Sequence, residues 1–96
     1  MIIFFKKFGT TLNGRQFGKE SFAAFEPILR QIKSDESVII DFEGVITFTP
    51  SWGDEFIGPL IERFEDRVSF KNTENPSVQA SLKMLETIYN KKLISP

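Results

Sequence analysis

"VIIDFEGVITFTPSWGDEF", residues 38–56, joins a predicted buried strand to the predicted start of a helix. The first five residues, Val38 to Phe42, include four apolar side chains with little polar alternation. This pattern is typical of a strand that is covered on both faces, as in a parallel sheet. Apolar residues then recur every four positions from Trp52, which predicts a helix from about Pro50 to Glu65, with a bend at Gly58-Pro59.

The flanking segments repeat this strand-to-helix alternation. Ile2–Phe8 and Val68–Asn72 are short β-branched and aromatic runs and predict strands. One apolar face within residues 13–33 predicts a helix, and Asn75-Pro76 is a typical start for another. The order predicts one α/β domain over residues 1–96, with a three- to four-stranded, mostly parallel sheet and about three helices.

The composition excludes several classes of function. The formal net charge is −1, so no basic field attracts nucleic acid. The 96 residues contain neither Cys nor His, which removes the thiolate nucleophile and the commonest general base and metal ligand. The start, "MIIFFKK", resembles neither a secretory signal nor a membrane span. We therefore expect a soluble cytoplasmic protein without metal, cofactor, membrane or nucleic-acid partner.

The junction before the second predicted helix has two structural interpretations. Thr49 can cap the helix with Pro50 at its first position, or Ser51 can cap it with Asp54 three residues later. In both cases Asp54 and Glu55 are expected in the first turn, where the helix dipole favours negative charge. Helix-start chemistry alone would then explain these polar residues.

A functional interpretation of the same junction remains open. Ser51 is a candidate phosphorylation site, since a phosphate there would add about −1.5 to −2 charges at a helix N-terminus. Trp52 fits a helix–sheet core contact, yet tryptophan is also a common interface anchor. Arg15 is either a charged contact for a partner or one half of an intramolecular ion pair.

Catalysis has little support in the sequence. Neighbouring carboxylates on a helix, such as Asp54 and Glu55, point about 100° apart, a poor geometry for an acid–base pair. No histidine is present to activate Ser51. The glycines of "FGTTLNG" lack the spacing of a phosphate-binding loop. We therefore expect a protein that is not an enzyme.

Residues 38–60 resemble the STAS-like family of small bacterial domains of unknown function. The shared signature is a strand that ends in Asp-Phe-x-Gly-Val, followed by Pro-Ser-aromatic-small-Asp-Glu. The residues that match it are Asp41, Phe42, Gly44, Val45, Ser51, Trp52, Asp54 and Glu55. Gly9, Arg15 and Gly18 resemble an upstream Gly…Arg-x-x-Gly segment, and residues 68–85 resemble the closing strand and helix.

The resemblance to the broader STAS class implies an α/β domain of about four strands. Its anti-sigma factor antagonists bind partner proteins, among them kinases of the histidine-kinase-like ATPase type. They carry Asp-Ser-Ser-Gly before the second helix, where one serine is phosphorylated. Counting forward from Asp41 places Ser51 at that position, whereas counting back from Gly53 places Trp52 there.

The leading hypothesis is a non-enzymatic regulatory module that docks on a protein partner through Ser51, Trp52, Asp54, Glu55 and Arg15. The partner implied by the resemblance is an anti-sigma or kinase-like ATPase. One alternative is a small-ligand or nucleotide sensor that uses the crevice at the carboxyl ends of the strands. Another is a self-associating structural subunit, such as a homodimer, in which some of the eleven phenylalanines make the contact.

Overall fold

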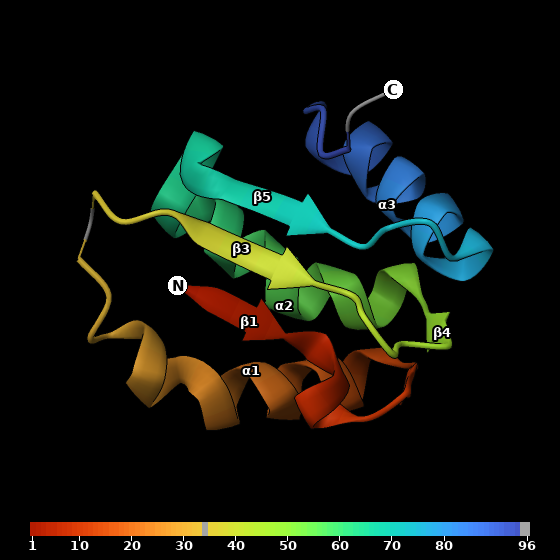
Figure 1. Ribbon diagram of the computed structural model, residues 1–96, viewed down its shortest axis with the longest axis horizontal. Helices are drawn as coiled ribbons and strands as arrows, with labels where there is room; N and C mark the ends of the chain where they lie inside the picture. The colour runs from red at the N-terminus through yellow and green to blue at the C-terminus, as the bar shows by residue number, and fades with distance from the viewer. Residues whose placement is uncertain (34, 95–96) are drawn as a thin grey trace.

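The computed structural model describes residues 1–33 and 35–94 and confirms an α/β fold (Figure 1). Over these residues it contains three α-helices and five short strands. Their order is β1 (Ile2–Phe4), β2 (Thr11–Leu12), α1 (Arg15–Leu29), β3 (Val38–Asp41), β4 (Thr47–Phe48), α2 (Pro50–Phe64), β5 (Val68–Lys71) and α3 (Pro76–Tyr89).

The strands of the described residues form two parallel sheets. The larger sheet has the order β1-β3-β5, so the strand over residues 38–41 is central, as a buried apolar run predicts. Its register aligns Ile3 with Ile40 and Ile40 with Phe70. The smaller sheet pairs β2 with β4 just before α1 and α2 begin, and it escaped prediction because two-residue strands carry no periodicity.

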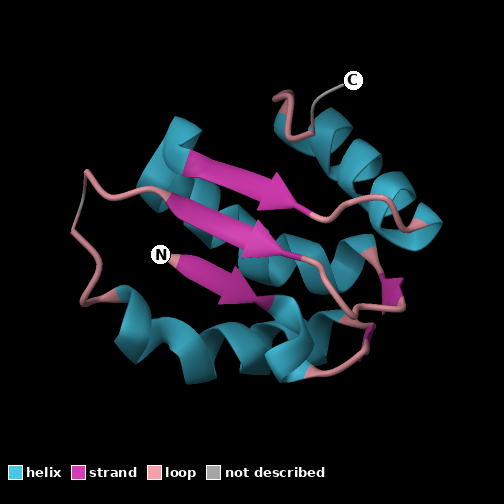
Figure 2. Ribbon diagram, in the orientation of Figure 1, coloured by secondary structure: helices cyan, strands magenta, loops and turns pink. Residues whose placement is uncertain are grey.

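The prediction that the central strand is covered on both faces is wrong for one face. Figures 1 and 2 show the three strands in front of α2, with none of the described helices over their front face. Ile2 and Phe4 are 46% and 40% exposed, and Ile39, which is aligned with Ile2, is half-buried. Apolar strand residues look alike in sequence whether or not a helix covers them, so this face could not be predicted.

The predicted first strand is also shorter than the sequence suggests. It ends at Phe4, and Phe5–Phe8 forms a 3₁₀-helix instead of continuing to residue 8. Residues three apart lie on the same side of a 3₁₀-helix. Phe5 and Phe8 therefore both reach the core, with their ring centroids 6.1 Å apart.

Aromatic rings fill the core behind the sheet. Trp52 is fully buried and stacks on Phe56, with ring centroids 5.4 Å apart and an interplanar angle of 6°. Edge contacts from Phe5, Phe17 and other phenylalanines surround the indole. Of the eleven phenylalanines, all within the described residues, Phe4 is the one with an exposed side chain. Aromatic rings therefore make up much of the core.

Both later helices begin at the predicted proline. Thr49 caps α2 with Pro50 at the first helical position, and Asn75 caps α3 by accepting hydrogen bonds from the amides of Ser77 (2.7 Å) and Val78 (3.2 Å). The side-chain nitrogen Nδ2 of Asn75 also donates a hydrogen bond to the backbone carbonyl of Ile46, 3.0 Å away. This bond connects the start of α3 to the β3–β4 loop. Helix α2 continues through Pro59 without a break.

Asp41, at the carboxyl end of β3, holds together the loop that follows β3 and the loop that leads from β5 to α3. Its Oδ1 accepts hydrogen bonds from the amide of Glu43 and the side chain of Asn72, both at 2.9 Å. Burial acts to raise the pKa of Asp41, but these hydrogen bonds, together with Lys71 and Lys6, outweigh it and leave the pKa below its usual value. The Asp-Phe-x-Gly-Val segment is thus explained by a turn that needs this carboxylate.

Replacing Asp41 with alanine should lower the free energy of unfolding by about 2 kcal/mol, because two partly buried donors lose their acceptor. Glu43→Ala is the control, since Glu43 is exposed, and its effect should stay within about 0.5 kcal/mol. Urea unfolding monitored by circular dichroism measures both values. Equal effects for the two variants would show that the turn does not depend on the Asp41 carboxylate.

Candidate functional site

The start of α2 is organised by Thr49 and not by Ser51. The Thr49 hydroxyl oxygen accepts from the amides of Trp52 (3.5 Å) and Gly14 (3.4 Å) and lies 3.3 Å from the Ser51 hydroxyl. Ser51 therefore lies inside the first turn, and the interpretation in which it caps the helix is wrong. From the sequence, Asp54 and Glu55 were expected in the first turn of the helix. This expectation is wrong, because the helix begins at Pro50 and both acids fall in its second turn.

Asp54 and Glu55 of α2 instead bind a cation from α1. Arg15, the first residue of α1, donates to Asp54 at 2.8 Å and to Glu55 at 2.6 Å. The Tyr89 hydroxyl, from the last residue of α3, donates to the other oxygen of Asp54 at 2.6 Å. We call Arg15, Asp54, Glu55 and Tyr89 the polar cluster. It connects all three helices, and the intramolecular ion pair considered for Arg15 is confirmed.

These contacts change the acidity of two groups. The hydrogen bond from Arg15, followed by that from Tyr89, lowers the pKa of Asp54 against the opposing effect of burial. Burial, followed by the hydrogen bond to Asp54, raises the pKa of Tyr89 well above its usual value. At neutral pH the cluster therefore holds a carboxylate, a guanidinium and a neutral phenol, which suits binding and positioning better than proton transfer.

The pKa of Asp54 provides a test of the cluster. Arg15→Ala should raise this pKa towards its usual value, because the largest stabilising contact of the carboxylate is lost. Arg30→Ala is the control, since Arg30 pairs with Glu26 instead. Carboxyl ¹³C NMR titration measures the pKa in each variant.

The sign of the pH dependence follows from the same contacts. A folded-state pKa below the unfolded value, about 3.9, gives stability that is present above that value and lost as pH falls through the folded pKa. The Arg15→Ala variant should therefore lose less stability on acidification than wild type. If stability falls equally in the variant and in wild type as the pH is lowered, Arg15 does not stabilise the Asp54 carboxylate.

The five residues predicted to form one docking surface do not all lie at the surface. Arg15, Asp54 and Glu55 meet at one exposed face, and Ser51 is half-buried one turn before the acids. Trp52 is fully buried, so it is a core residue, and the expectation that it contacts a partner directly is wrong. Trp52 and Phe56 are four residues apart, so both side chains lie on the same face of α2, and this face packs into the aromatic core.

Sequence reasoning missed Tyr89. It is the single tyrosine in a chain with eleven phenylalanines. A hydroxyl where a plain ring is otherwise used indicates a polar partner for a partly buried side chain. That signal was present, but it could not identify Asp54 as the acceptor.

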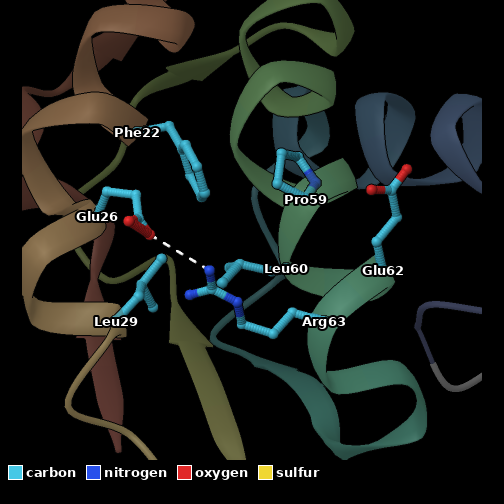
Figure 3. Close-up of a pocket in the computed structure, with 7 residues that line it drawn as sticks. All are labelled: Phe22, Glu26, Leu29, Pro59, Leu60, Glu62 and Arg63. Atoms are coloured by element: carbon cyan, nitrogen blue, oxygen red, sulfur yellow. Dashed lines mark hydrogen bonds and ion pairs between the residues drawn. The ribbon is translucent and has the colours of Figure 1, made fainter.

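Two clefts flank α2. The larger, about 460 Å³, lies between α1 and α2 and is lined by apolar Phe22, Leu29, Pro59 and Leu60 (Figure 3). Glu26 and Arg63 point toward each other across it, 3.4 Å apart, whereas Glu62 points away from this pair (Figure 3). The second cleft, about 360 Å³, lies between α2 and α3 and includes Asp54, Glu55 and Tyr89 of the polar cluster.

The parallel sheet, the helical crossovers and the polar loop before α2 together define a small α/β domain of the STAS-like class. Residues 25–78 match the STAS-like domain of unknown function (DUF4325), and the chain belongs to this family. The resemblance seen in the sequence is thereby confirmed. No curated protein and no solved structure gave a significant match. No helix among residues 1–33 and 35–94 combines the length and apolar character needed to cross a bilayer.

Proposed function

We propose that this protein is a regulatory binding module that acts by docking and not by catalysis. The observation that carries the proposal is the polar cluster, in which residues from α1, α2 and α3 meet at a solvent-facing surface. Arg15 is 56% exposed, yet it is held in place by two carboxylates. A charged surface that is fixed before binding loses little side-chain entropy when a partner arrives.

The docking surface consists of Ser51, Arg15, Asp54 and Glu55, without Trp52. Its partner is a protein, and by resemblance to anti-sigma factor antagonists a histidine-kinase-like ATPase is the first candidate. The acids and Arg15 give the surface both signs of charge, which favours specificity and orientation over raw affinity.

A comparison of pull-downs from the native cell tests this surface. The Arg15→Ala, Glu55→Ala double variant should fail to capture partners that wild type captures. Lys33→Ala should keep them, since Lys33 is exposed and lies beyond the C-terminal end of α1, the helix that Arg15 begins. Circular dichroism confirms that each variant is folded. Recovery of the same partners by the folded double variant would refute the docking surface.

Phosphorylation of Ser51 would regulate the same surface. Residues three and four apart lie on one helix face, so a phosphate on Ser51 would stand beside Asp54 and Glu55 and compete with them for Arg15. The ion pairs that join α1 to α2 would be weakened, which would release a partner. Incubation with the candidate kinase, followed by mass analysis of peptides, tests this. Absence of added phosphate on the Ser51 peptide would refute it.

Self-association is a second candidate, supported by a different surface. The uncovered front face of the sheet carries Ile2 and Phe4, and parallel sheets are usually covered on both faces. A second copy packed on this face would cover them. Light scattering over a range of concentrations should then show a dimer for wild type and a monomer for Phe4→Ser. A monomeric wild type would exclude this candidate.

A further inference from the structure

With Trp52 buried, the apolar part of the docking surface must come from elsewhere. Met84 and Ile88 on α3 are 56% and 60% exposed. They are four residues apart, so they share one face of the helix. Large apolar side chains exposed side by side are a common mark of a contact surface.

The contacts of α3 place this pair beside the polar cluster. The hydroxyls of Ser77 and Ser81 donate to the carbonyl of Phe48, and the Tyr89 hydroxyl donates to Asp54. Together with Leu85, these three residues recur every fourth position along α3. They form one row of side chains, and this row faces β4 and α2. Met84 and Ile88 immediately precede Leu85 and Tyr89, so they lie along the border of that row.

The other border of the row faces the sheet. The side chain of Gln79 donates to the carbonyl of Thr73, in the loop that follows β5. Successive α-helical residues are rotated by about 100°, which puts Met84 and Ile88 on the opposite border. They therefore lie on the side of α3 that points away from the sheet and next to α2.

The cleft between α2 and α3 lies next to this pair, since Tyr89, which follows Ile88, lines it. Gly58 forms part of its floor, where a Cβ atom would lie only 3.3 Å from the Tyr89 hydroxyl. Pro59 follows, and because proline has no amide hydrogen the carbonyl of Glu55 lacks its usual helical donor.

The charges of the cleft favour a cationic partner. Asp54, Glu55 and Glu62 line it, against Lys91. The Lys91 ammonium is already paired with Asp66, 2.7 Å away, and Arg15 is shared between Asp54 and Glu55. Glu62 makes no salt bridge with any of the described residues. Negative potential here repels anionic membranes and nucleic acids.

We propose that the partner presents a basic amphipathic helix to this site. Its apolar residues cover Met84 and Ile88, and its lysine or arginine side chains enter the cleft, where the carboxylate of Glu62 accepts them. An exposed apolar pair beside an acidic cleft between two helices suits an amphipathic helix with one apolar and one basic face. This inference rests on the proposed docking function and assigns the partner's chemistry.

A pair of synthetic peptides tests the inference. The first is an 18-residue helix of leucine and lysine, with leucine at helical spacing on one face, and the second replaces every lysine with glutamate. Each is titrated into the ¹⁵N-labelled full chain. The lysine peptide should shift amide signals in α2 from Asp54 to Glu62 and in α3 around Met84 and Ile88, and the glutamate peptide should not.

Variants assign the contacts. Ile88→Ser and Glu62→Lys should each lower the affinity for the lysine peptide about tenfold, since each removes one contact that holds the peptide helix. Ile28→Ser is the matched control: Ile28 is a 38% exposed isoleucine on α1, and this variant should bind as wild type does. Equal binding of both peptides, no binding of either, or shifts centred on α1 would overturn the inference.

The outcomes for the two proposals are separable. If the peptides fail but the pull-down still depends on Arg15 and Glu55, the docking function stands and only the partner's chemistry is wrong. If the pull-down is unaffected by that double variant, the docking function itself fails, whatever the peptides do.

Discussion

Trp52→Ala is expected to lower the free energy of unfolding by about 4 kcal/mol, because truncating a buried tryptophan removes its burial and leaves a cavity. The indole is 0% exposed and stacks on Phe56. A chain of this length has a total stability of about 5–14 kcal/mol, so the variant would lose a large share of it. Urea unfolding followed by circular dichroism measures the change.

Trp52→Phe is the control for this prediction. The indole nitrogen of Trp52 is buried and has no hydrogen-bond partner in the described residues, so phenylalanine removes an unpaired polar group while it keeps a ring. The loss should be about 1–2 kcal/mol, well below that of alanine. If both variants unfold at the wild-type midpoint, the indole is not a core residue.

The burial of Trp52 also affects how docking experiments are interpreted. A Trp52→Ala chain that no longer binds a partner would most simply have lost its fold, since the indole is not at the surface. Variants of Arg15 and Glu55 avoid this difficulty because they change exposed or half-buried side chains. The surface is therefore tested at the polar cluster and not at the tryptophan.

Gly18→Ala is expected to lower the free energy of unfolding by about 3 kcal/mol, since overpacking that forces the backbone to move is among the more damaging changes in a core. A Cβ atom at Gly18 would lie 2.5 Å from the Trp52 carbonyl oxygen and 3.0 Å from the Trp52 Cα. Both contacts are to the backbone of α2, so neither can be relieved by turning a side chain. The two helices would have to move apart.

Gly58→Ala provides the matched comparison on α2. There a Cβ atom would meet the Tyr89 hydroxyl at 3.3 Å, at the end of a side chain. Alanine is preferred to glycine inside a helix by about 1 kcal/mol, which offsets this closer contact. Thermal unfolding should place Gly58→Ala near wild type and Gly18→Ala well below it. Equal melting temperatures for the two variants would show that the α1–α2 approach does not require glycine.

The sequence predicted those parts of the fold that depend on local chemistry. Asn75-Pro76 starts a helix through capping and proline geometry, which neighbouring residues decide, whereas Thr49 and Ser51 were alternative caps for the helix at Pro50 until the structure showed Thr49. The central strand over residues 38–41 was equally clear from its apolar run. The 3₁₀ turn at Phe5–Phe8 was not predictable, because it depends on rings that meet only in the folded core.

The candidate site was less predictable, for a related reason. Arg15 and the acids at 54 and 55 were each noticed, but their pairing joins residues that are distant in the chain. Acids near a helix start suit the dipole so well that the ion pair was not needed to explain them. Met84 was missed because an apolar helix residue looks the same in sequence whether it faces the core or solvent.

The parallel ladders have a consequence for how the chain folds. Each joins strands separated by a whole helix, so within the described residues no hairpin is available as an early local nucleus. Folding of such long-range pairings is slow, on the order of milliseconds or longer. During synthesis β1, α1 and β3 emerge first and can close one ladder, whereas β5 adds to β3 only after α2 is complete. The central strand thus waits with one edge unpaired while the segment from β4 to β5 is still being made.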